Sequence, residues 1–372
     1  MMHCRLSRVI SSAAPIQRRA TRLVKPPASN HPRAGPPPRS FHTRTETTMP
    51  IATDFSFAHD FAGAIMPQLR DMTAPVDLLG PLRPMVGPKP HDGRDAQRTW
   101  RGKGFNMIWR PNFGNESGPK DFFLELNFTD EELSFTEITG SGIANRGLVQ
   151  GTVKLGGAAY VQSIKDSFDH TGQHFEPGAW AHVPATTGPS EPTTVVRMGS
   201  IPHGTTINLQ GKAITAPKPL FSPASITPFV IGSPDDGATG LVHFPEEILA
   251  TPSTSRTPLA RVAALTQAEL SNPNLFLSQA IASQNILSTG VLILSSDTSV
   301  PGSVPNAGGG TDNIAFLGPN ALAPKVTTIF WLERVRDPHG HEFTQLQYTQ
   351  RVLLNFKGLS WPHITVATLR HA

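Results

Sequence analysis

Apolar and polar residues alternate along most of the chain from residue 99 onward. Phe122, Leu124 and Leu126 lie on one side of an extended segment, and Glu125 and Asn127 lie on the other. Alternation with a period of two predicts β-strands that bury one face. The segments predicted as strands in this way are 100–109, 122–128, 133–135, 158–164, 180–183, 195–201, 205–210, 291–295, 314–317, 326–336, 343–356 and 364–369.

Short turns connect several of these segments. Residues 202–204 (Pro-His-Gly) separate 195–201 from 205–210, and residues 337–340 separate the two longest segments. Such turns join antiparallel neighbours, whereas parallel strands need long crossover connections. About ten strands joined mostly by turns therefore predict a mainly β fold, an antiparallel β-barrel able to enclose one small ligand.

The middle of the chain interrupts the alternation. Residues 212–262 are rich in Pro, Ser and Thr, and one helix is predicted over 266–287, with a start signal at Asn272-Pro273. The alternating pattern resumes after this stretch. We therefore predict a single barrel domain over 99–371 with a long irregular insertion at about 212–290.

The N-terminal residues differ in charge from the rest. Residues 1–45 contain nine basic residues and no acidic residue, and they are rich in Arg, Ser and Ala. This composition is typical of a mitochondrial transit peptide, so a mitochondrial location is expected. The alternative is a start at Met49, which would give a cytoplasmic protein. Residues 46–98 are predicted to form an extended N-terminal arm.

Charge and cysteine content exclude several classes of function. Without the first 45 residues, 23 basic residues remain against 28 acidic ones, a net charge of −5, which argues against nucleic acid as a partner. No stretch reaches the roughly 20 apolar residues of a membrane-spanning helix. The single cysteine is Cys4, so the barrel has no thiolate for a haem iron or an iron–sulfur cluster. A bound metal would need His, carboxylate or Tyr ligands.

His363 is the first candidate for such a ligand. It follows Pro362 and precedes an alternating apolar segment, which places it near the start of a strand at the barrel rim. A neutral imidazole in this position could ligate a metal or a haem iron. The alternative is a structural histidine that hydrogen-bonds to a backbone carbonyl.

His174 and Glu176 form a second candidate site. They share the parity of one strand face, so the carboxylate could orient the imidazole as a general base. His203, in the turn 202–204, could join them. The alternative for all three is a solvated surface position. Arg101 could pair with an anionic group such as a propionate, or form a surface ion pair.

Three short motifs in a fixed order resemble a known family. They are Thr-Trp-Arg-Gly-Lys-Gly at 99–104, a His-x-Glu-x-Gly-x-Trp strand at 174–180, and His363 followed by an alternating strand. Together they resemble the nitrobindin-type haem-binding β-barrels, which are similar in shape to lipocalins and fatty-acid-binding proteins. The resemblance implies that His363 is the axial ligand of haem b. Family domains are shorter, which marks 212–290 as an insertion and 141–165 as expanded.

Two hypotheses for function follow. In the first, a haem-binding barrel handles peroxide, peroxynitrite or nitric oxide at the His363-ligated iron, with Met107 and Trp109 lining the pocket; activity of a peroxidase or peroxynitrite isomerase type is left open. In the second, a cofactor-free barrel binds, carries, cyclises or isomerises a lipophilic small molecule, with acid–base chemistry at His174, Glu176 and His203. A structural protein with a filled core is a third option.

Overall fold

The computed structural model describes residues 77–92, 94–234, 239–297 and 309–371. The predicted transit peptide and most of the predicted N-terminal arm lie outside these residues. Among the described residues, no helix has the length and apolar character needed to cross a membrane.

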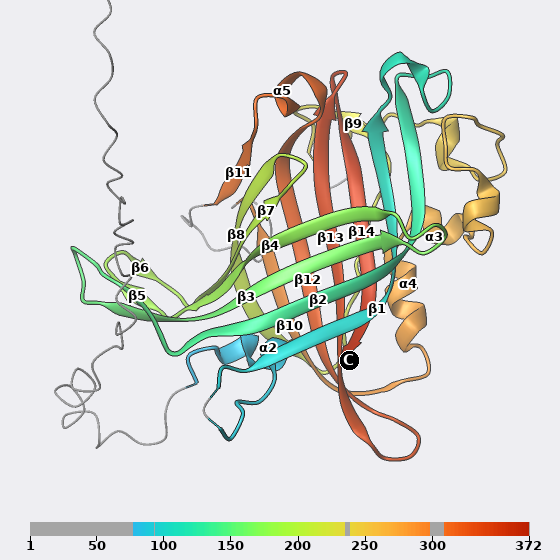
Figure 1. The fold of residues 1–372 in the computed structure, drawn as a ribbon. Helices are drawn as coiled ribbons and strands as arrows, with labels where there is room; N and C mark the ends of the chain where they lie inside the picture. The colour runs from blue at the N-terminus through green and yellow to red at the C-terminus, as the bar shows by residue number, and fades with distance from the viewer. Residues whose placement is uncertain (1–76, 93, 235–238, 298–308, 372) are drawn as a thin grey trace, which may run out of the picture. The chain divides into compact units, whose positions relative to one another are not determined.

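Ten long strands form one closed antiparallel sheet, as the alternating pattern predicts (Figure 1). Each strand pairs with the next along the sheet, and pairing of the first with the last closes the barrel. In sheet order the strands are β1 (Gln97–Pro111), β2 (Phe122–Asn145), β3 (Val153–Asp166), β4 (Gly172–Val183), β7 (Thr194–Ile201), β8 (Thr205–Ala216), β10 (Asn285–Ser295), β12 (Leu322–Arg336), β13 (Glu342–Phe356) and β14 (Leu359–His371).

Short elements complete the fold. They are the strands β5 (Thr186–Thr187), β6 (Ser190–Glu191), β9 (Phe229–Val230) and β11 (Gly310–Asn313), the α-helices α2 (Arg83–Val86), α3 (Gln267–Ser271), α4 (Asn274–Ile281) and α5 (Leu317–Asn320), and the 3-10 turns η2 (Gly80–Leu82), η3 (Phe113–Asn115), η4 (Pro245–Glu247) and η5 (Leu259–Val262). The strand predicted over 314–317 is wrong, because β11 ends at Asn313 and α5 begins at Leu317.

The single helix predicted over 266–287 is also wrong. Thr266 caps α3 by accepting a hydrogen bond from the Glu269 N–H, and α4 follows with Pro273 at its N-cap, after a break at Asn272. Proline removes a backbone donor, so it starts a helix more readily than it continues one. The strand β10 then starts at Asn285, inside the predicted helix.

A plug of apolar side chains fills one end of the barrel. Leu79, Leu82 and Met85, from the segment that precedes β1, are buried together with inward-facing strand residues. The Trp100 Nε1–H donates to the Met85 carbonyl oxygen at 2.9 Å. The end of the predicted extended arm is therefore a short helical plug.

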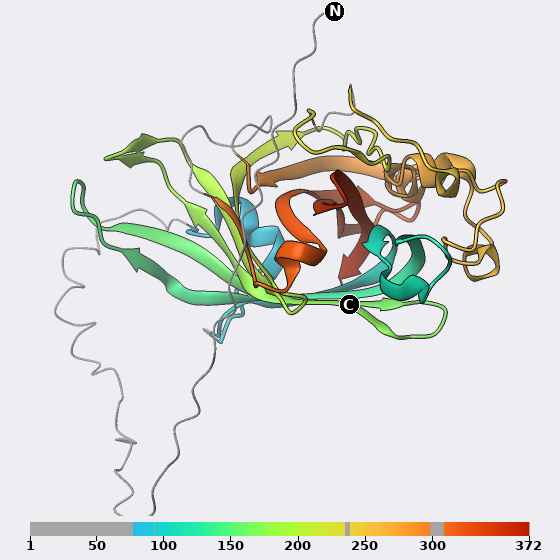
Figure 2. The same ribbon diagram turned by 90° about the horizontal axis from the view of Figure 1, so that it is seen from above.

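A second apolar cluster lies on the outside of the barrel. The excursion between β8 and β10 covers the outer face of neighbouring strands, and α4 packs against β13 and β14 (Figures 1 and 2). The Trp109 Nε1–H donates to the Ile226 carbonyl oxygen of this excursion at 2.9 Å. The excursion spans 217–284 rather than 212–290, because β8 and β10 are each longer than predicted.

The neighbouring strands β2 and β3 extend beyond the barrel. The distal parts of β2 and β3, with β5 and β6, project from it as a separate wing (Figure 1). Residues 141–165, which the resemblance marks as expanded, include the distal parts of β2 and β3. Its turn leaves Leu148 fully exposed.

Replacing a plug residue tests the role of the plug in stability. Leu82 is 0% exposed and Leu148 is 100% exposed. We expect Leu82→Ala to lower the free energy of unfolding by about 2–5 kcal/mol, because it leaves a cavity in a packed core. Leu148→Ala should change it by less than about 0.5 kcal/mol. Urea unfolding followed by tryptophan fluorescence measures both, and equal effects would show that the plug does not stabilise the barrel.

Candidate functional site

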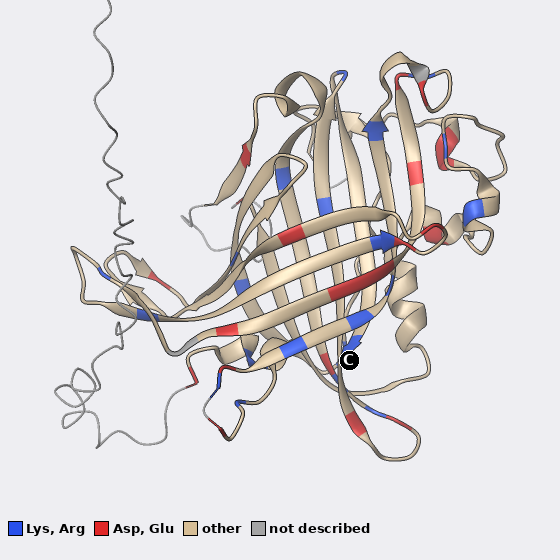
Figure 3. Cartoon of the chain, viewed as in Figure 1, with Lys and Arg blue, Asp and Glu red and all other residues tan. Residues whose placement is uncertain are grey.

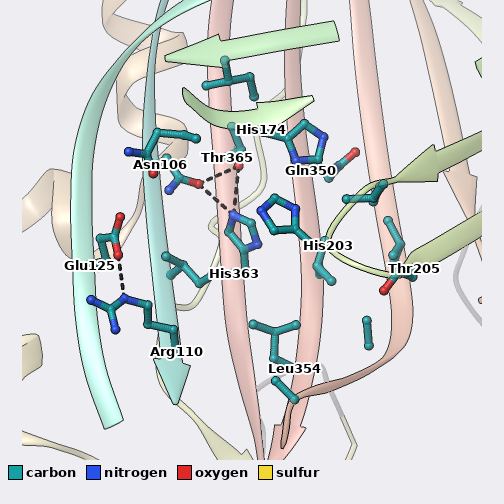
Figure 4. A pocket seen from close by; sticks show the side chains of 18 of the residues that line it. Asn106, Arg110, Glu125, His174, His203, Thr205, Gln350, Leu354, His363 and Thr365 are labelled. Carbon is teal, nitrogen blue, oxygen red and sulfur yellow. Dashed lines mark hydrogen bonds and ion pairs between the residues drawn. The ribbon is translucent and has the colours of Figure 1, made fainter. Parts of the chain in front are cut away.

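A cavity of about 350 Å³ occupies the barrel away from the plug (Figure 4). Along β1, Trp100 contacts the plug, whereas Asn106, Ile108 and Arg110 line the cavity. Its apolar lining residues include Ile108, Ile164, Ile201, Leu317, Val326, Val352 and Leu354. Its polar lining residues include Asn106, Gln162, His174, His203, Thr205, Tyr348, Gln350, His363 and Thr365.

Three histidines from distant parts of the sequence line this cavity. His363 comes from β14, His174 from β4, and His203 from the turn between β7 and β8 (Figure 4). The rings of His174 and His203 are stacked, with centroids 6.1 Å apart and an interplanar angle of 24°. The fold therefore brings His363 to the same cavity as His174 and His203, which the sequence had placed in a separate candidate site.

His363 is tied to β1 through one ring nitrogen. Its Nε2 lies 2.8 Å from the Asn106 Oδ1, which also accepts a hydrogen bond from the Thr365 hydroxyl at 2.9 Å. Burial, with repulsion from His174 and His203, lowers the pKa of His363 to about 3, so the imidazole is neutral at physiological pH. Within the described residues, the other ring nitrogen, Nδ1, has no hydrogen-bond partner.

His174 is backed by a fully buried carboxylate. Its Nε2 lies 3.2 Å from the Glu176 Oε2, and the Arg197 guanidinium donates to the Glu176 Oε1 at 2.8 Å. Burial alone would raise the pKa of Glu176, but the neighbouring Arg197 charge lowers it to about 2. A carboxylate hydrogen-bonded to an imidazole fixes the orientation of the ring, as a general base requires. Burial and the neighbouring His174 lower the pKa of His203.

A polar network forms the floor between cavity and plug. Tyr160 donates to Glu176, and Tyr348 donates to Glu131. The Gln162 amide donates to the Tyr348 hydroxyl at 2.9 Å. Burial raises the pKa of Glu131 to about 7, even though the hydrogen bond from Tyr348 opposes that shift. Glu131 is therefore partly protonated at neutral pH, deep inside the barrel.

Three predicted site residues lie away from the cavity. Met107 and Trp109 belong to the outer cluster, so the prediction that they line the pocket is wrong. Strand side chains alternate, and the neighbours Asn106 and Ile108 face inward instead. Arg101 forms an exposed ion pair with Glu132 at 2.7 Å, the surface alternative. Figure 3 places the basic residues of β1 beside the acidic residues of β2.

Several residues that shape the site are not evident from the sequence. Asn106, Tyr348, Gln350 and Thr365 all line the cavity. The sequence signal for them is a polar residue at a strand position whose side chain faces the inside of the barrel. That signal was ambiguous because both faces of β1 are buried, so alternation alone did not tell which face meets the cavity.

The arrangement of possible metal ligands in the described ranges limits how a metal could be held. No three His, Cys, Asp or Glu side chains are grouped there as a metal-binding cluster. His363 is the imidazole whose free nitrogen combines neutrality with burial at the cavity wall. Its Nδ1 is therefore a candidate donor for a cofactor metal.

Comparisons with known proteins give little further information. No family model matches the chain, and no curated protein matches it. The crystal structure of Rv2717c from M. tuberculosis matches with 14% sequence identity and a TM-score of 0.33. The match covers 81% of this chain and 99% of that chain. At this TM-score the likeness supports no conclusion about function.

The buried Glu131 predicts a pH dependence of stability. Between pH 4.5 and about 7 the unfolded carboxyl is ionised while the folded one keeps its proton, so the folded state binds more protons. The free energy of unfolding should therefore fall across this window, by at most about 3 kcal/mol from this group. Glu131→Gln should flatten the fall in part, since Glu333 also has a pKa of about 7.

Urea unfolding at a series of pH values between 4.5 and 8 measures this effect. Glu132→Gln is the matched control, because Glu132 neighbours Glu131 on β2 but is exposed. Parallel curves for the wild type and Glu131→Gln would show that Glu131 titrates normally.

Proposed function

We propose that this barrel binds haem b with His363 as the axial ligand and handles a small reactive ligand such as peroxide, peroxynitrite or nitric oxide. The observation that supports this most is the state of His363. Its imidazole is neutral, lines the cavity, and keeps one nitrogen without a partner among the described residues. A neutral histidine held by a hydrogen bond through its other nitrogen is the usual donor to a haem iron.

The cavity fits haem in part. Its apolar walls suit a porphyrin face, and the Arg110 guanidinium lines the cavity beside Glu125, with 2.6 Å between them. Pockets for whole ligands range from about 300 to 1,000 Å³, and 350 Å³ lies at the small end. A porphyrin would therefore be enclosed in part, with one edge outside the cavity. Arg110 replaces Arg101 as the candidate partner of a propionate.

The residues around His363 have separable roles in this proposal. When bound, haem would supply an iron with an open coordination position for the small ligand. The apolar residues of the cavity wall would limit the entry of water. His174, oriented by Glu176, can take a proton from a ligand that enters as an acid and return it to a leaving oxygen. Activity of a peroxidase or isomerase type would depend on this pair.

One observation favours a second candidate. The cavity has room for a small lipophilic molecule, and His174 with Glu176 forms an oriented acid–base pair at its wall. A cofactor-free barrel that binds or isomerises such a molecule would use the same pair without iron. The two candidates differ in their dependence on His363.

Titration with hemin tests the first candidate. We expect the purified protein to give a sharp Soret band that saturates at one equivalent, and His363→Ala to lose it, because the axial donor is gone. His339→Ala is the matched control, since His339 is exposed in the turn between β12 and β13. A response that is equal in the wild type and His363→Ala would contradict axial ligation.

A lipophilic fluorescent probe tests the second candidate on the same variants. Probe binding that survives His363→Ala, together with no hemin response in the wild type, would favour the cofactor-free barrel. Loss of probe binding in Val352→Phe would show that the probe binds in the cavity, because Val352 lines it and a larger side chain would fill part of it.

A further inference from the structure

A row of hydrogen-bonded side chains leads to His363 along the inner rim of the barrel. Its members are Asp166 at the end of β3, Asn127 on β2, Asn106 on β1 and His363 on β14. The first three are at most 7% exposed. The row therefore links the four neighbouring strands β3, β2, β1 and β14, and it ends at the cavity.

Each hydrogen bond in the row has a defined donor and a defined acceptor. A carboxylate only accepts hydrogen bonds, so the Asn127 Nδ2 donates to the Asp166 Oδ2 at 2.6 Å. The Asn127 Oδ1 then faces the Asn106 Nδ2 at 3.5 Å, a long contact. This leaves the Asn106 Oδ1 pointing at His363, where it also accepts from the Thr365 hydroxyl.

This order of donors and acceptors determines which nitrogen of His363 holds the proton. Since the Asn106 Oδ1 is an acceptor, the His363 Nε2 at 2.8 Å must be the donor. A neutral imidazole with a proton on Nε2 has its lone pair on Nδ1. The charged and titratable groups that line the cavity with His363 are Arg110, Glu125, His174, His203 and Tyr348. Of these, His174 and His203 add to burial in lowering the pKa of His363.

The first member of the row is anchored by the excursion. The Arg261 guanidinium, from η5, donates to the Asp166 Oδ2 at 2.9 Å and to the Asp169 Oδ2 at 2.6 Å. The Phe168 N–H donates to the Asp166 Oδ1 at 2.7 Å. The carboxylate is therefore fixed from outside the barrel, by a segment that does not line the cavity.

We propose that Asp166, Asn127 and Asn106 are positioning residues that hold His363 as its Nε2–H tautomer, so that the cavity ligand binds through Nδ1. Naming the haem iron as that ligand rests on the proposed function, whereas the tautomer does not. Partners behind a ligating histidine typically change metal affinity 10–100-fold when they are removed. The excursion thereby influences a site that it does not contact.

Nitrogen-15 NMR of the histidine-labelled full chain tests the tautomer. The His363 signals are those missing from His363→Ala. We expect an Nε2 shift typical of a protonated nitrogen and an Nδ1 shift typical of an unprotonated one. Asn106→Asp keeps the acceptor, so it should keep this tautomer and raise the pH at which His363 titrates. Asn106→Leu should give a mixture of both tautomers.

Hemin titration of the same variants tests which nitrogen binds the iron. Ligation through Nδ1 predicts that Asn106→Leu weakens hemin binding about 10–100-fold, and that Asn106→Asp retains it. Ligation through Nε2 predicts unchanged or stronger binding in Asn106→Leu, because the bond to Asn106 would have to break. Asn208→Leu, at an exposed position on β8, is the control for nonspecific effects, and circular dichroism checks the fold.

The outcomes separate the positioning of the His363 tautomer from the proposed binding of haem. A wild-type protein with the proton on Nδ1, or identical tautomers in the wild type and Asn106→Leu, would overturn the positioning role. An intact Nε2–H tautomer without any hemin binding would support the positioning role and overturn the proposed function.

Discussion

The pairing of β1 with β14 is the constraint on which the site depends. The two strands approach closely at two glycines of the Thr-Trp-Arg-Gly-Lys-Gly segment, where a Cβ on Gly102 would lie 2.1 Å from the Thr368 carbonyl oxygen. Only glycine tolerates such an approach. The resulting register sets Ile108 opposite His363 and Asn106 opposite Thr365. Closure of the barrel and orientation of the histidine are therefore consequences of the same contact.

Buried carboxyl groups in the barrel interior are neutralised in two different ways. Arg197 and Glu176 are both almost fully buried and form an ion pair, which offsets the cost of removing each from water. Among the described residues no cation pairs with Glu131, and burial favours its neutral form instead. These groups separate an apolar end filled by the plug from a polar end that forms the cavity. The candidate site residues His174, His203 and His363 thus lie at the cavity end of the barrel.

The excursion buries the outer face of several strands, so these strands are buried on both faces. It covers the outside of strands whose inside already faces the core, so large apolar residues occur at both parities. Met107 and Trp109 were assigned to the pocket because they are apolar and share a parity, yet they pack against the excursion. The same segment places Arg261 on Asp166, which connects the outside of the barrel to the row that ends at His363.

The sequence by itself determined the local features of this protein. Alternation with a period of two predicted the antiparallel barrel of about ten strands, and proline and glycine marked most of its turns. It also singled out His174, Glu176, His203 and His363 as chemically capable residues. Their meeting in one cavity, the inward direction of Asn106, and the burial that shifts the pKa of His363 were decided by tertiary structure alone. The reason is that period and turn type are local properties, whereas register, closure and burial depend on strands far apart in the chain.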